Sequence, residues 1–227
     1  MHRKIHSLVS ELMIDDGAHG MDHVDRVYRA AMRFADAEGG NRDIIGLAAL
    51  LHDADDYKLF GQESADNLTN ATRIMNQCDV PTDIQTHVKE IIRTMGYSRA
   101  LTGIRPTTIE GKIVSDADMF DDRGATAIAR TIIYGAKINR KLFDRNIWPN
   151  IGESLTIEKY KNPAESTTIN HFFEKLLLVK NIMLTESGRR EMAESNDLLI
   201  SFLRSFFTEN NAPEWIEYLD NFLAKNV

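Results

Sequence analysis

Four side chains in three separate segments have the chemistry of a metal site. His23 stands in the first turn of a predicted helix, His52 and Asp53 end the most apolar segment, and Asp118 lies beside a third apolar stripe. Buried polar and charged groups have to be hydrogen-bonded, paired or bound to a metal. Two imidazoles and two carboxylates suit one Mn²⁺, Ni²⁺, Fe²⁺, Co²⁺ or Zn²⁺ ion better than Mg²⁺, which prefers oxygen ligands.

Each of these residues also has an ordinary interpretation. The His-Asp pair is short enough to occur by chance, with the aspartate capping a neighbour and the histidine hydrogen-bonded in the core. His19 and His23 can belong to a polar helix start on which Asp22 is the N-cap. For Asp121 and Asp122 a solvent-exposed acidic helix end is the favoured interpretation.

The elements that must position these residues are helices. Apolar residues recur with helical spacing over most of the chain, and alternating strand patterns are almost absent. The helical segments are 3–14, 22–38, 43–53, 64–78, 82–95, 108–120, 123–136, 166–185, 188–209 and 213–225. The sequence therefore predicts one all-α domain over residues 1–227, a bundle of about nine to ten helices. Segment 43–53 is so apolar that it should be buried on most sides.

The stretch from about 137 to 165 differs from the rest of the chain. It is rich in Asn, Pro and Gly and has little periodicity, so it is predicted to be a long irregular connection. Such connections in compact domains are usually functional or mobile. Its basic residues, Lys137, Arg140, Lys141 and Arg145, suggest a lid that reaches a phosphate.

Composition narrows the class of protein. In 227 residues no apolar run approaches the roughly 18 needed to span a bilayer, and no apolar region follows the basic start, so we expect neither membrane span nor secretion signal. Cys78 is the single cysteine, which excludes an internal disulfide and fits a cytoplasmic location. A net charge of −7 without a basic block argues against an extended nucleic-acid-binding surface.

The order of the site residues resembles the HD-domain superfamily of metal-dependent phosphohydrolases, and within it the small stand-alone bacterial HD hydrolases. The resemblance covers roughly residues 15–207, and its pieces are specific in combination rather than singly. In chain order they are His19, His23, Arg26 and Val27; Leu51-His52-Asp53 with Asp56 and Lys58; Glu110 to Asp118; Gly124-Ala125; Ile128 to Thr131; and Asn170 to Leu176.

This resemblance implies a site and a reaction. The metal ligands would be His23, His52, Asp53 and Asp118, and the substrate-binding residues would be His19, Arg26, Asp56 and Lys58, with Asp116 beside them. Water activated by the metal would attack a phosphate ester or anhydride of a small phosphorylated substrate, a nucleotide being one candidate. Asp53 or Asp116 would help take the proton. Lys58 would offer three donors and a point charge to the phosphate.

Three departures from that family branch keep other functions open. Met119-Phe120 stands where an Arg-Leu pair is usual, and the segments 94–98 and 124–127 also differ. These changes leave the predicted metal ligands in place but alter the residues expected around the substrate. The alternative is therefore a degenerate HD domain that binds a nucleotide or partner without turnover. A two-iron oxygenase would need further histidines, and only His87 lies in the relevant interval. The sequence leaves open whether the C-terminal helices pack inside the domain or form a homodimer face.

Overall fold

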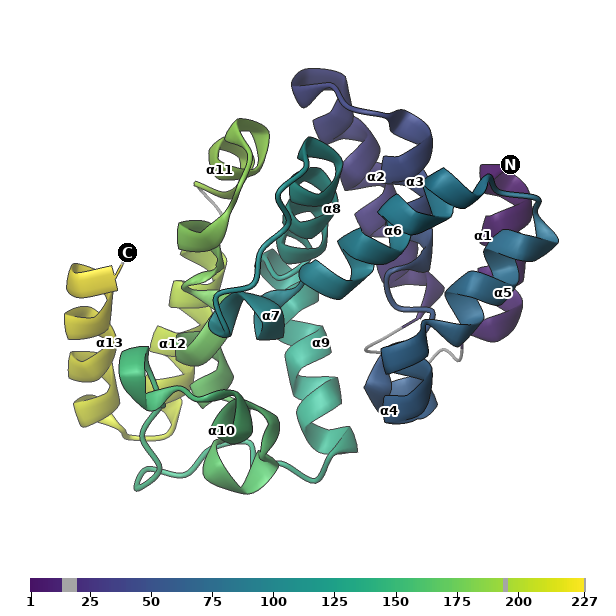
Figure 1. Cartoon of the computed structure of the whole chain (residues 1–227). Coiled ribbons are helices and arrows are strands. Elements are labelled where there is room, and N and C mark those ends of the chain that lie inside the picture. The colour runs from purple at the N-terminus through teal and green to yellow at the C-terminus, as the bar shows by residue number, and fades with distance from the viewer. Residues whose placement is uncertain (14–19, 194–195, 227) are drawn as a thin grey trace. The chain divides into compact units, whose positions relative to one another are not determined.

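The structure is all-α, as the sequence predicts. It is a computed structural model that describes residues 1–13, 20–193 and 196–226, except the side chains at 161 and 163. Within these ranges it contains thirteen α-helices and no strand (Figure 1), and ten of the helices are nine residues or longer. In the described ranges, no helix combines the length and apolar character that crossing a membrane requires.

The chain divides into two compact units. The first comprises Met1–Asp121 with Leu184–Gly188, and the second comprises Asp122–Met183 with Arg189–Val227. The short segment 184–188 therefore belongs to the first unit although both of its neighbours in sequence belong to the second. That the whole chain acts as one domain stays a prediction.

The first unit is built around a buried central helix. Its helices are α1 (His2–Leu12), α2 (Met21–Glu38), α3 (Arg42–Leu51), α4 (Tyr57–Asn67), α5 (Thr69–Gln77), α6 (Thr82–Thr94), α7 (Tyr97–Leu101) and α8 (Ile109–Phe120). Helix α3 packs against α1, α2, α6 and α8. All its side chains from Ile44 to Leu51 are buried, which confirms the expectation from its apolar sequence.

Local sequence signals explain where the site helices begin and end. Gly39 follows α2 with φ +83°, a backbone conformation that glycine adopts without steric cost. Asn41 then caps α3 by accepting hydrogen bonds from two backbone N–H groups, and Thr108 caps α8 by accepting one from Gly111. The prediction that Asp22 caps α2 is wrong, because Gly20 holds that position and Asp22 lies inside the first turn.

The second unit has an aromatic core. Its helices are α9 (Gly124–Lys137), α10 (Ile157–Lys161), α12 (Asp197–Glu209) and α13 (Pro213–Asn226), while α11 (Glu186–Met192) spans the change between units. Phe173, Phe207, Trp215 and Leu219 are fully buried in one cluster, to which α12 and α13 both contribute. The C-terminal helices therefore pack inside this unit, one of the two alternatives that the sequence leaves open.

Two long helices expected in the C-terminal half are shorter in the structure. Within 166–185 only a π-helix (Phe172–Leu176) and a 3₁₀-helix (Val179–Ile182) form, and 188–209 is divided between α11 and α12. The backbone N–H groups of Thr168 and Ile169 donate to the carbonyls of Lys141 and Leu142 instead of forming a helical turn. Long-range backbone pairing thus replaces the local pairing that the apolar period predicts.

The stretch 137–165 contains α10 and two 3₁₀-helices (Gly152–Ser154 and Pro163–Glu165), and is irregular between them and before Gly152. Two of its basic side chains have partners in their own unit. The Lys141 ammonium lies 3.0 Å from the Asp144 carboxylate, and the Arg145 guanidinium donates to the carbonyls of Asn210 and Asn211. A lid function for this stretch stays a prediction.

Glu174 is a buried carboxylate in the π-helix, with a side chain that secures the irregular stretch. It accepts a hydrogen bond from the Asn150 backbone N–H at 3.0 Å, and both its oxygens lie 2.8 Å from the Ser166 hydroxyl. Burial raises the pKa of Glu174 above its usual value, against the opposing effect of these hydrogen bonds. The ionised form is therefore less favourable in the folded state than in the unfolded chain.

This raised pKa predicts a pH-dependent contribution to stability. Well below its unfolded-state pKa the residue is protonated in both states, and as pH rises from that value to the raised folded-state pKa the folded state loses stability relative to the unfolded chain. Glu174→Gln should remove that loss, so its unfolding free energy should improve relative to wild type with rising pH. Both tryptophans lie in this unit, so urea unfolding followed by tryptophan fluorescence reports on it. Exposed Glu153→Gln is the control, and parallel pH curves for wild type and Glu174→Gln would contradict the prediction.

Candidate metal centre

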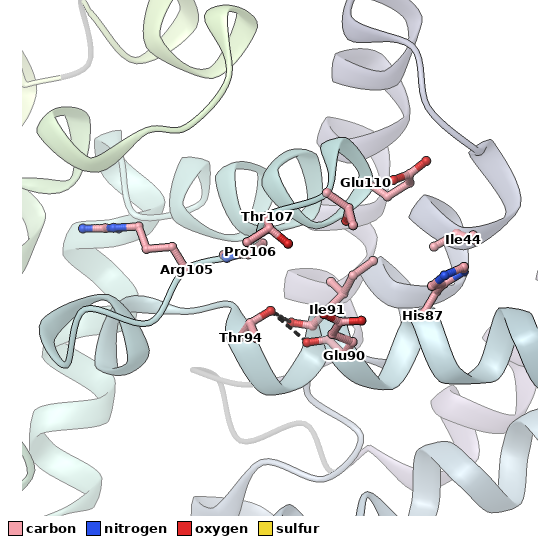
Figure 2. Close-up of a pocket in the computed structure, with 10 residues that line it drawn as sticks. Ile44, His87, Glu90, Ile91, Thr94, Arg105, Pro106, Thr107 and Glu110 are labelled. Carbon is pink, nitrogen blue, oxygen red and sulfur yellow. Dashed lines mark hydrogen bonds between the residues drawn. The ribbon is translucent and has the colours of Figure 1, made fainter.

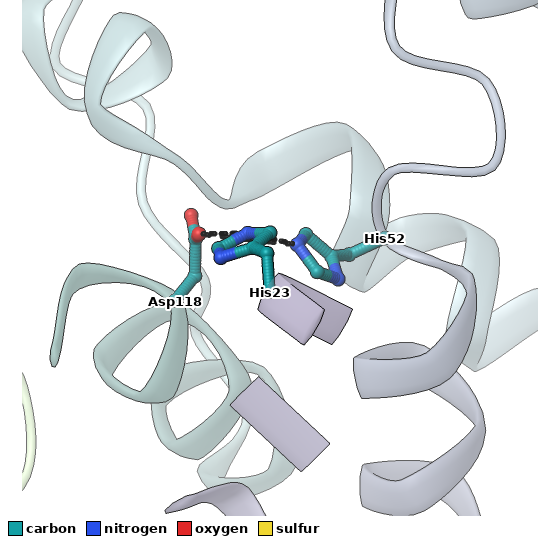
Figure 3. Close-up of side chains that lie close together, drawn as sticks. All are labelled: His23, His52 and Asp118. Carbon is teal, nitrogen blue, oxygen red and sulfur yellow. Dashed lines mark hydrogen bonds and ion pairs between the residues drawn. The ribbon is translucent and has the colours of Figure 1, made fainter. Parts of the chain in front are cut away.

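Three helices of the first unit bring His23, His52 and Asp118 together. His23 is the third residue of α2, His52 directly follows α3, and Asp118 lies in the last turn of α8. One ligand atom from each lies within 4.8 Å of the others (Figure 3). Both histidines are buried, whereas the Asp118 side chain is 25% exposed, so the cluster has one side open to solvent. The three residues form a candidate metal site.

The spacing of the ligand atoms is close to, and in part slightly wider than, that expected around one ion. The two Nε2 atoms of His23 and His52 are 3.1 Å apart, and Asp118 Oδ1 lies 3.5 and 3.9 Å from them. Asp53 Oδ2 lies 3.5 Å from both Nε2 atoms, so this predicted ligand adjoins the two histidines. Ligation of one ion by all four residues stays a prediction. Ligands bound at about 2.1 Å around a single ion are about 3.0–3.4 Å apart in octahedral or tetrahedral arrangements.

The outer hydrogen bonds of the two imidazoles leave their inner nitrogens facing the candidate metal position. His52 Nδ1 lies 2.9 Å from the Ala49 carbonyl oxygen, and His23 Nδ1 lies 2.7 Å from Asp121 Oδ2. Both partners are acceptors, so we assign the ring proton of each histidine to Nδ1. The two Nε2 lone pairs then face each other at 3.1 Å, an arrangement that a metal ion between them would stabilise.

The loop after His52 places two of the predicted substrate-binding residues near the cluster. Asp56 caps α4, and its Oδ1 accepts a hydrogen bond from the Lys58 backbone N–H at 2.7 Å. Burial raises the pKa of Asp56, the Lys58 ammonium opposes this shift, and the Asp53 carboxylate adds to it. His19, another predicted substrate-binding residue, lies outside the described residues.

Asp116 anchors the segment 184–188 within the first unit. Its carboxylate is 1% exposed and accepts hydrogen bonds from the backbone N–H groups of Leu184 and Thr185 and from the Thr185 hydroxyl, at 2.7–3.0 Å. On the same segment, the Ser187 backbone N–H donates to Glu38 Oε1 at 2.6 Å. The segment thus connects α8 with α2, two of the helices that carry the cluster. A substrate contact by Asp116 stays a prediction.

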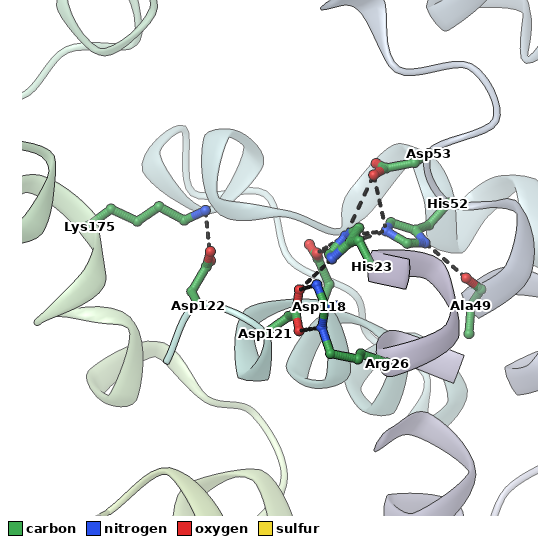
Figure 4. Close-up of polar contacts among 9 residues, drawn as sticks. All are labelled: His23, Arg26, Ala49, His52, Asp53, Asp118, Asp121, Asp122 and Lys175. Carbon is green, nitrogen blue, oxygen red and sulfur yellow. Dashed lines mark hydrogen bonds and ion pairs between the residues drawn. The ribbon is translucent and has the colours of Figure 1, made fainter. Parts of the chain in front are cut away.

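The prediction of a solvent-exposed acidic end to α8 is wrong for Asp121, because Asp121 is buried. It accepts hydrogen bonds from Arg26 Nε at 2.6 Å and Nη2 at 3.0 Å, in addition to the contact with His23 (Figure 4). The hydrogen bond to Asp121 raises the pKa of Arg26. Asp122 is partly buried and forms an ion pair with Lys175 at 2.7 Å. Substrate binding by Arg26 stays a prediction.

Sequence reasoning missed Asp121 although a signal was present. Asp121 follows Asp118 by three residues, and residues three apart share one face of a helix. The spacing of His23 and Arg26 on α2 is the same. Two acidic and two basic residues at matching intervals therefore indicated that the two helices pair along these faces.

A separate open pocket lies at the other ends of the site helices (Figure 2). Ile44 and Glu110, which line it, precede His52 and Asp118 by eight residues each, or about 12 Å along a helix. His87 also lines this pocket. The extra histidine that a two-iron oxygenase would require is thus placed away from the cluster, which argues against that alternative.

Comparisons with known proteins agree with this arrangement. The model of the HD domain family matches residues 20–123. A solved structure from Lactobacillus plantarum is 32% identical, with a TM-score of 0.81 over 93% of this chain and 97% of that one. A solved HD-superfamily hydrolase from Bacillus thuringiensis is 30% identical, with a TM-score of 0.65 over the same shares of the two chains.

A further relative is the uncharacterized protein YpgQ of Bacillus subtilis. It is 28% identical over 207 residues, which cover 88% of this chain and 89% of YpgQ. Its crystal structure in complex with ADP superposes with a TM-score of 0.65 and 23% identity, over 92% of this chain and 97% of that one. At that identity the superposition is evidence of the same fold.

The anchoring role of Asp116 predicts the effect of Thr185→Val. The substitution keeps the size of a side chain that is 3% exposed, but removes the hydroxyl that donates to Asp116 and accepts from the Gly188 N–H. We expect the first unit to lose about 2 kcal/mol of stability, while the stoichiometry of metal binding stays unchanged. Urea unfolding followed by far-UV circular dichroism measures the loss. Thr86→Val, at an exposed threonine of α6, is the control. An unchanged unfolding midpoint in Thr185→Val would show that this anchor contributes nothing.

Proposed function

The chain belongs to the HD domain family, and on this premise we propose that it is a metal-dependent phosphohydrolase acting on a small phosphorylated substrate. The observation that carries the proposal is the convergence of the His23 and His52 imidazoles with the Asp118 carboxylate, beside which Asp53 Oδ2 lies 3.5 Å from both imidazoles. The bond cleaved would be a phosphate ester or anhydride.

The donor set supports one divalent cation of the transition-metal type. Two imidazole nitrogens and two carboxylates favour Mn²⁺, Fe²⁺, Ni²⁺, Co²⁺ or Zn²⁺ over Mg²⁺. When bound, such a cation supplies Lewis acidity, which polarises a phosphoryl oxygen and makes water a better nucleophile near neutral pH. His23 and His52 would hold it through Nε2, because each Nδ1 is committed to an outer acceptor.

The chain's own residues would then position the substrate and move the proton. Asp53 is our candidate for taking a proton from the attacking water, since it converges on the cluster and its side chain is 14% exposed. Lys58 would neutralise charge on the phosphate from the start of α4. Because the Asp116 carboxylate is engaged by segment 184–188, we give it a positioning role here.

A nucleotide is the substrate class we propose, because the relative YpgQ has been solved with ADP bound. The alternative is a domain that binds a nucleotide without turnover. Met119 favours this alternative, since the family branch usually has arginine at this position and the methionine here is buried in α8. No cationic group is therefore available from that position.

Metal analysis tests the site directly. We expect one divalent transition-metal ion per chain in untagged wild-type protein, and loss of the ion in His52→Ala because one of the two imidazole ligands is removed. His87→Ala is the matched control, since His87 lines the pocket at the opposite end of the helices. Equal metal content in all three proteins, with or without reconstitution, would rule out the proposed centre.

Turnover is tested with Lys58→Met in the metal-loaded protein. If the ammonium contacts a phosphate, its loss removes a charge-assisted interaction, and kcat/KM for nucleoside di- or triphosphates should fall about tenfold or more. Lys89→Met on α6 should leave kcat/KM unchanged. Nucleotide binding with full metal occupancy but no release of phosphate or pyrophosphate would instead identify the non-hydrolytic alternative.

A further inference from the structure

The residue that ends α8, Asp121, contacts one of the candidate metal ligands through its side chain. Asp121 is the C-cap of α8, and its backbone N–H donates to the Asp118 carbonyl at 3.1 Å. This bond fixes Asp121 relative to Asp118. The Asp121 side chain turns back to α2, where Oδ2 lies 2.7 Å from His23 Nδ1 (Figure 4).

We infer that Asp121, held by Arg26, is a positioning residue that selects the tautomer and ring orientation of His23 and thereby sets the affinity of the site for its cation. The inference rests on the proposed function, since it concerns the same site. A carboxylate that accepts the Nδ1 proton leaves Nε2 as the ligand and holds the ring in one rotation. Asp121 is thus predicted to act through His23, without touching metal or substrate.

Arg26 completes this arrangement by holding the carboxylate at two points. Its Nε donates to Oδ1 at 2.6 Å and its Nη2 to Oδ2 at 3.0 Å, the planar geometry in which arginine binds carboxylates most strongly. Arg26 and His23 lie three residues apart on α2, so one carboxylate from α8 contacts two side chains on the same face. The contact keeps Asp121 turned away from the ligand atoms, where a free carboxylate would compete as a ligand.

The two histidines are therefore oriented by different means. His52 donates to the Ala49 carbonyl of its own helix, three residues earlier, a contact that forms with α3 itself. His23 depends on a residue 98 positions away in sequence, so its orientation requires α2 and α8 to be aligned. A substitution at Asp121 should therefore affect one imidazole and spare the other.

The experiment compares Asp121→Asn with Asp122→Asn. The adjacent Asp122 loses the same charge but contacts Lys175 and not His23. Titration with Zn²⁺ and with Mn²⁺ gives the dissociation constants, and long-range ¹H–¹⁵N spectra of the metal-free proteins near pH 9 give the histidine tautomers. We expect Asp121→Asn to weaken metal affinity about 10- to 100-fold and to populate the other tautomer of His23 alone. Asp122→Asn should match wild type.

Arg26→Lys keeps the test decisive if Asp121→Asn folds poorly. It retains the charge but loses the two-point contact, so it should weaken metal affinity in the same direction by a smaller factor. Tight binding by wild type with unchanged affinity and tautomer in both variants would overturn the inference and leave the proposed function intact. If wild type binds no cation, the proposed function fails. The spectra of the metal-free proteins then still decide whether Asp121 selects the tautomer.

Discussion

Two imidazole nitrogens facing each other at 3.1 Å, each with its ring proton assigned to the far side, are the constraint that defines the candidate metal site. The hydrogen bonds of the outer nitrogens help to hold the rings in this orientation. The buried helix α3 supplies one acceptor locally, and the pairing of α2 with α8 supplies the other. The packing of these helices therefore orients the two imidazoles as well as forming the hydrophobic core.

Much of this arrangement could be predicted from the sequence, because it follows local rules. The apolar run that forms α3 had to be buried, and the histidine that ends it had to lie at the edge of the core. The convergence of His23, Asp53 and Asp118 with this residue was predicted from their placement beside apolar stripes and from the resemblance to the HD superfamily.

The remaining features depend on contacts between residues far apart in sequence, which periodicity does not report. Asp121 was assigned to an exposed helix end because its hydrogen-bonding partners lie on α2. The expected helix over 166–185 was also lost to contacts between distant residues. At its start, the N–H groups of Thr168 and Ile169 donate to the carbonyls of Lys141 and Leu142, and at its end those of Leu184 and Thr185 donate to Asp116. Pairing with these distant acceptors satisfies the backbone groups without a helical turn.

The membership of segment 184–188 in the first unit has a consequence for biosynthesis. The chain emerges from the ribosome N-terminus first, and domains generally fold as they appear. All the candidate metal ligands have emerged long before Thr185, whereas the hydrogen bonds from Leu184 and Thr185 to the Asp116 carboxylate form only when this late segment arrives. Helices α2 and α8 pack directly on each other, but the additional link through this late segment forms only after most of the second unit has been made. A nascent chain truncated before residue 184 would contain the candidate ligands but would lack the hydrogen bonds that segment 184–188 forms with α8 and α2.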